Sequence, residues 1–204
     1  MFGGRFSSGR SEAWYRAPLG WVRSLVQIQS SRPFSDYQSI MEKLTGNVKS
    51  EAFELSPDMP PKNLYLSSVG NIESLVDEIA PSSQHFGLFL ALDADSLDDG
   101  KIGQVAKRLL LKGLVYLCAW GPDCERVHDL FDLAALEMDP QQNRAVIMTT
   151  WHANEPLHEA VWFFVNSAFP DEAYARTCHD WVFAPIGHPD WEKTIRESHS
   201  SGTA

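Results

Sequence analysis

Short apolar runs alternating with amphipathic stretches constrain the fold of this chain more than any other feature. Residues 86–92 (FGLFLAL) and 114–120 (LVYLCAW) are continuous apolar runs that end in polar or turn-forming residues. Such runs are typical of strands buried on both faces of a sheet. The stretches at 97–111 and 122–137 repeat apolar side chains with the period of a helix that packs against a sheet. The alternation therefore predicts parallel strands joined by helices.

The same pattern continues on both sides of these runs. Further strands are predicted at 144–151 and 181–185, a short strand or lead-in at 63–67, and helices at 72–80, 155–168 and 191–197. Right-handed crossovers make this an α/β fold, a three-layer Rossmann-like sandwich. Its sheet is expected to be short, mainly parallel and of about four to five strands, with helices on both faces. The order of the strands does not follow from the sequence.

Residues 41–197 are predicted to form a single α/β domain within the 204-residue chain. Residues 1–40 have no helical or strand period and are predicted to be a disordered extension, as is the tail at 198–204. Residues 8–33 also resemble a translated transfer-RNA gene, with VQI at 26–28 similar to a translated T-loop. This resemblance predicts that translation begins instead at Met41. The alternative is a basic, flexible extension with a targeting or binding role.

Charge and composition exclude several classes of protein. The formal net charge is −10 at pH 7, and residues 1–40 have a net charge of +3, so the remainder has −13. No nucleic-acid partner is expected, because such binding depends on Lys and Arg that neutralise phosphates. No apolar run is long enough to span a membrane. Three cysteines without zinc-type spacing favour free thiols and a cytoplasmic location.

Ligands of such sheets bind beyond the carboxyl ends of the strands, so residues that follow the predicted strands are the candidates for a pocket. They are Asp93, Asp95, Trp120, Asp123, Cys124, Thr150, Trp151, His152 and Glu155. The alternative is that the two indoles only cover the edge of the sheet. No cofactor or metal is expected, because the HEXXH, G-x-G-x-x-G and P-loop motifs are absent. The acidic turn LDADSLDDG departs from a calcium loop, because Leu97 stands at the third ligand position.

Cys124 is the candidate nucleophile of this set, because it lies in the first turn of a predicted helix, where the pKa of a thiol is lowered. His152 or His128 would be its base, and Asp123 or Glu155 would orient that base. The flanking carboxylates oppose ionisation of the thiol. A structural thiol is therefore the alternative.

Two segments resemble a known family. They are CAWGPDCERVHDLFD at 118–132 and MTTWHANEPLHEAVWFF at 148–164, and they resemble an uncharacterised bacterial family of Rossmann-like domains over about residues 63–191. The family has no known activity, so the resemblance implies only the fold and a bacterial origin. The function remains unknown at this point. An accessory or protein-interaction domain with a possible protein partner is favoured, and a small-molecule-binding domain or enzyme that uses the crevice is the alternative.

Overall fold

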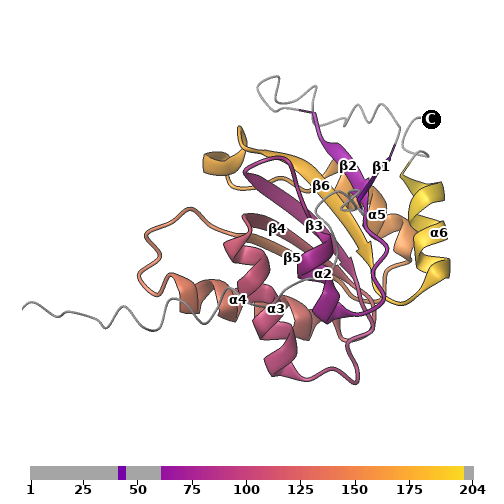
Figure 1. Ribbon diagram of the computed structural model, residues 1–204, viewed down its shortest axis with the longest axis horizontal. Helices are drawn as coiled ribbons and strands as arrows, with labels where there is room; N and C mark the ends of the chain where they lie inside the picture. Colours follow the sequence, from indigo (N-terminus) through magenta and orange to yellow (C-terminus); the bar gives the residue numbers. More distant parts are fainter. Residues whose placement is uncertain (1–40, 45–60, 200–204) are drawn as a thin grey trace, which may run out of the picture. The chain divides into compact units, whose positions relative to one another are not determined.

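The computed structural model describes residues 41–44 and 61–199, so residues 1–40 and the end of the predicted tail lie outside it. One sheet has the strand order β1-β2-β6-β3-β4-β5 (Figure 1). Its strands are β1 (Glu42–Lys43), β2 (Asn63–Leu66), β3 (His85–Ala91), β4 (Leu114–Trp120), β5 (Met148–His152) and β6 (Cys178–Pro185). The helices are α2 (Ile72–Glu78), α3 (Asp99–Leu111), α4 (Cys124–Met138), α5 (Leu157–Asn166), the 3₁₀ turn η2 (Glu172–Tyr174) and α6 (Pro189–Ser198).

The predicted α/β sandwich is confirmed, but the sheet has six strands rather than four to five. Strands β2 to β6 run parallel to one another, and β1 pairs with β2 in the antiparallel direction. The chain leaves the central strand β3 and adds β4 and then β5 on one side. It then returns through α5 to place β6 between β2 and β3. β1 was not expected because it has only two residues, both of them charged.

Helices cover both faces of the sheet (Figure 1). One core lies between the sheet and α2, α3 and α4, and a second core lies between the sheet and α5 and α6. Neighbouring residues of β3 alternate between them: Leu88 belongs to the first core and Phe89 to the second. Both are fully buried, as expected of a strand covered on both faces. In the described part of the chain, no helix combines the length and apolarity needed to cross a bilayer.

Element boundaries differ from the predicted ones where turns intervene. The strand predicted at 144–151 begins only at Met148, and the strand predicted at 181–185 already begins at Cys178. The helix predicted at 155–168 covers Leu157–Asn166. It starts later because Asn154 has a positive φ of 63°, and because a residue that precedes proline, here Glu155, avoids the helical region.

Two polar side chains, one partly and one fully buried, connect the start of β2 to the rest of the domain. The Lys62 ammonium donates to the carbonyl oxygens of Phe164, Val165 and Ala168 at 2.8, 2.9 and 2.6 Å. It thereby satisfies carbonyls at the end of α5 that have no partner within the helix. Burial lowers the pKa of Lys62 to about 7. Asp180 of β6, which is fully buried, accepts hydrogen bonds from the loop before β3.

Candidate functional site

The ends of β4 and β5 lie side by side at the carboxyl edge of the sheet. The two strands are parallel neighbours, and Trp120 is paired with His152 in their register. Adjacent strands are about 4.8 Å apart. The structure therefore brings together the backbone positions that the strand-end rule selects from the sequence.

The side chains of Trp120, His152 and Glu155 meet on the face covered by α5 and α6. The indole Nε1 of Trp120 donates to the Glu155 carbonyl oxygen at 2.8 Å, and its ring lies 5.1 Å from that of Trp191. His152 Nδ1 lies 2.8 Å from Glu155 Oε2. The histidine ring is 4.6 Å from that of Phe163 in α5, and its buried Nε2 atom has no partner. These contacts fix the turn between β5 and α5.

Cys124 and Trp151 lie on the other face. Cys124 belongs to the core under α2, α3 and α4, and the Trp151 ring lies 4.5 Å from that of His128 in α4. Successive side chains of a strand point to opposite faces, so Trp151 and His152 cannot serve the same pocket. Within the described residues, no hydrogen bond joins the Cys124 thiol to the His152 ring. The thiol–imidazole pair that the sequence suggests is not formed.

Burial raises the pKa of the Cys124 thiol above its ordinary value, and backbone N–H groups, including that of His152, offset this effect only in part. A thiol with a raised pKa is a weak nucleophile at neutral pH, because the thiolate is the reactive form. The helix start at Cys124 therefore does not produce the activated cysteine that the sequence suggests.

We expect Cys124 in the native chain to react with iodoacetamide at pH 8 at least about tenfold more slowly than a free cysteine. The rate is followed by mass spectrometry, and Cys124→Ser identifies the signal. Cys118 and Cys178 are also buried and serve as internal references. A thiolate that titrates well below pH 7 and is lost in His152→Ala would restore the nucleophile interpretation.

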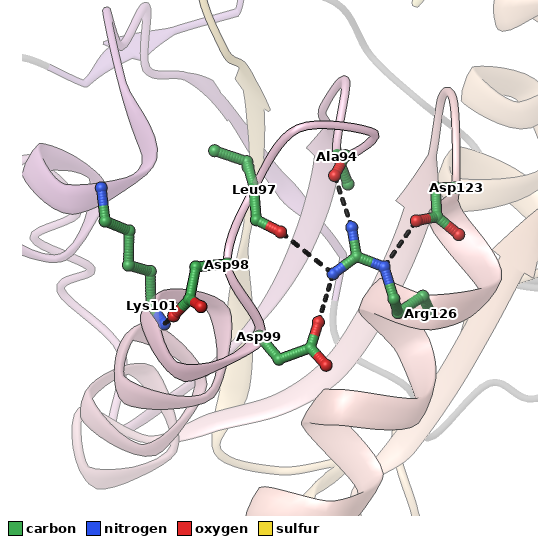
Figure 2. Close-up of polar contacts among 7 residues, drawn as sticks. All are labelled: Ala94, Leu97, Asp98, Asp99, Lys101, Asp123 and Arg126. Atoms are coloured by element: carbon green, nitrogen blue, oxygen red, sulfur yellow. Dashed lines mark hydrogen bonds and ion pairs between the residues drawn. The ribbon is translucent and has the colours of Figure 1, made fainter.

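The remaining acidic candidates lie in the loops after β3 and β4, where Arg126 holds these loops together. Figure 2 shows that the Arg126 guanidinium reaches Asp123 and Asp99 and also the carbonyl oxygens of Ala94 and Leu97. Asp123 is therefore bound to an arginine and does not orient a histidine. Arg126 was missed in the sequence, although its spacing of three residues from Asp123 is a usable signal.

Asp93 and Asp95 lie in the exposed loop after β3. The backbone N–H of Asp95 donates to Asp93 Oδ1 at 3.2 Å, which is a local turn contact. Thr150, in the middle of β5, donates to the Leu117 carbonyl oxygen at 3.4 Å. In the described ranges no three His, Cys, Asp or Glu side chains are grouped to hold a metal ion.

A different surface, along β5 and α4, has the least expected composition. Five large apolar side chains are exposed there, and we call them the β5 surface. They are Leu133 (50% exposed), Leu136 (48%), Val146 (61%), Met148 (37%) and Trp151 (45%). Met148 and Trp151 are three residues apart in β5, so their side chains project from opposite faces of this edge strand and the surface extends around the edge. Leu136, Val146 and Met148 line a cavity of about 770 Å³ beside the start of β5. Large exposed apolar patches on folded proteins mark sites of interaction with proteins or membranes, or grooves that bind ligands.

The described chain is thus a Rossmann-like α/β domain in which the candidate crevice residues are divided between two faces and an apolar surface borders the last strand. Residues 70–201 match the model of a family described as a domain of unknown function (DUF7684). The chain belongs to that family. A search of curated proteins found no match.

Proposed function

We propose that this chain is a protein-interaction domain that binds a partner polypeptide along β5 and the β5 surface. The observation that supports this proposal is the contrast between the two edges of the sheet. Beyond β5 no further strand is paired in the described residues. An open edge strand presents unpaired N–H and C=O groups to which another chain can bind.

The opposite edge of the sheet, formed by β1, has features that prevent pairing with a strand of another chain. β1 has two residues, both charged, and Glu42 forms a bidentate ion pair with Arg196 of α6 at 2.9 and 2.8 Å. Short strands and charged side chains of this kind prevent pairing between edges. β5 has five residues, MTTWH, with neither Lys, Glu nor Pro among them. The β1 edge is thus blocked by charged side chains, whereas the β5 edge exposes apolar ones. This difference supports binding of a partner at the β5 edge.

Addition of a strand to a sheet edge is an established mode of peptide recognition. The backbone hydrogen bonds supply affinity, and pockets for alternate side chains supply specificity. The cavity lined by Leu136, Val146 and Met148 is suitably placed to be such a pocket. The Cys124–His152 pair is not formed, so the crevice offers less support for an enzyme than the β5 surface offers for an interaction domain. We also place the domain in the cytoplasm, because its three cysteines are free and buried.

Selection of peptides from an unbiased display library on the full chain tests this proposal. We expect the recovered peptides to lose at least about tenfold in affinity, or about 1.4 kcal/mol, when Trp151 is changed to Ser. The matched control is Trp162→Ser in α5, because Trp162 is similarly exposed, at 51% against 45% for Trp151, but lies on another element. Circular dichroism and thermal melting establish that both variants are folded.

The proposal would be overturned if binding of the recovered peptides depended on Trp120 or Trp191 at the carboxyl edge. It would also be overturned if no recovered peptide distinguished Trp151→Ser from Trp162→Ser. In either case the β5 surface would not be a binding site.

A further inference from the structure

We infer that the partner segment is extended, apolar and basic, with Lys or Arg side chains that face Asp129 and Asp132 of α4. This inference rests on the proposed function and adds the chemistry of the partner. Three observations support it: the charges that border the β5 surface, the position of the cavity, and the charges that would meet if the partner were a second copy of this chain.

The border of the β5 surface is acidic. Residues 124–152 contain five carboxylates and two arginines. Arg126 is already bound to Asp123 and Asp99, Glu137 is paired with Lys107, and Arg144 lines the cavity. Asp129 and Asp132 have side chains that are 71% and 49% exposed. In the described ranges neither is paired with Lys or Arg: both contact His128, and Asp132 also accepts a hydrogen bond from Thr149 at 2.7 Å. Two exposed carboxylates without a cation favour a cationic partner.

These carboxylates adjoin the apolar residues. Asp132 lines the cavity together with Leu136 and Met148. The His128 ring, which contacts both carboxylates, lies against the Trp151 ring at 4.5 Å. A strand paired with β5 would therefore run beside Trp151 at one end and the cavity at the other, with the two carboxylates alongside. Large apolar side chains that fill a pocket contribute most of the affinity of typical interfaces.

A second copy of this chain is less suitable as the partner. A two-fold symmetric dimer uses the same surface on both subunits. Pairing β5 with β5 of another copy would thus bring the acidic borders of two surfaces together. Like charges that face each other across a pair of strands are destabilising, and the net charge of −10 adds to the repulsion. The charge pattern favours a different protein with the opposite charge.

Three synthetic ten-residue peptides test the inference by isothermal titration with the full chain at low salt. They alternate Val with Lys, Val with Thr and Val with Glu. We expect the Val–Lys peptide to bind at least about tenfold more tightly than the Val–Thr peptide, and the Val–Glu peptide not to bind. The preference for lysine should decrease as the salt concentration rises from 50 to 500 mM.

Two double variants make the test specific to these carboxylates. Asp129→Asn with Asp132→Asn should remove the preference for the Val–Lys peptide, while the asparagine oxygen retains the acceptor for Thr149. The matched control is Asp95→Asn with Asp190→Asn, which removes the same charge from other exposed sites and should keep the preference.

The outcomes separate this inference from the proposed function. If the peptides bind in a manner that depends on Trp151 but show no preference for lysine, the inference is wrong and the interaction domain stands. Loss of the preference in the control variant would mean that only net charge matters, which also contradicts it. Self-association in sedimentation velocity that Trp151→Ser abolishes would identify a second copy as the partner instead. If no peptide or protein binding depends on Trp151, both proposals fail.

Discussion

Replacing Asp180 with Ala is expected to lower the free energy of unfolding by about 3–5 kcal/mol, because a fully buried carboxylate is removed and four donors at partly buried or exposed residues lose their charged acceptor. Asp180 accepts from the backbone N–H groups of Ser82 and Ser83 at 2.6 and 2.9 Å. It also accepts from the Ser82 hydroxyl at 2.9 Å and from Asn63 Nδ2 at 3.2 Å. Urea denaturation at pH 7 measures the loss. Asp190→Ala, at an exposed position of α6, is the control and should change stability by less than about 0.5 kcal/mol.

The same residue predicts a pH dependence. Burial alone would raise the pKa of Asp180, but the hydrogen bonds from Ser83, Ser82 and Asn63 outweigh burial and hold this pKa below its usual value. A folded-state pKa below the unfolded value of about 3.9 means that the stabilisation is complete above about pH 4 and is lost as the pH falls through the folded value. The difference in stability between wild type and Asp180→Asn should therefore decrease as the pH falls from 4 to 2. A constant difference would show that the folded-state pKa of Asp180 equals the unfolded value, and a difference that increases as the pH falls would show that this pKa is raised.

Phe164→Ala is expected to lower the free energy of unfolding by a similar amount, about 3–5 kcal/mol. The Phe164 ring is fully buried under α5, where ring centroids of Phe89, Trp181 and Phe183 lie 5.5, 5.1 and 5.1 Å away. Its removal leaves a cavity that these large side chains cannot close. Chemical denaturation gives the value.

Trp162→Ala is the matched control for this prediction, because Trp162 lies two residues earlier on the same helix and is 51% exposed. Its replacement should cost less than about 1 kcal/mol. A loss for Phe164→Ala as small as that of the control would mean that α5 presents another face to the sheet.

The fold was predictable from the sequence wherever burial on two faces leaves a continuous apolar run. β3 and β4 are such strands, and their runs at 86–92 and 114–120 locate them to within a residue or two. β1 could not be found in this way, because its two residues Glu42 and Lys43 are polar and the strand exists only through pairing with β2. The position of β6 between β2 and β3 results from pairing between segments distant in sequence, which local patterns do not encode.

The candidate site was predictable only in part. The strand-end rule correctly places Trp120 beside His152. Whether two side chains share a face depends, however, on the alternation of each strand and on which face the next helix covers. The His152 ring points towards α5, whereas Cys124 begins α4 on the other face of the sheet. Leu133 lies in the stretch at 122–137 that apolar periodicity predicts to pack against the sheet, whereas half of this side chain is exposed. α4 lies beside the edge strand β5, and in the described chain no further strand or helix packs beyond it to cover Leu133.

The sequence by itself determined the class of fold and the approximate places of most helices and strands, because these depend on local periodicity and on which residues must leave water. Only the tertiary structure decided the order of the strands, the division of the candidate crevice between two faces, and the exposure of apolar residues beside β5. These properties depend on which elements become neighbours. The sequence shows that a residue is apolar but not whether it is buried. Burial depends on whether another strand or helix packs against the residue in the folded chain.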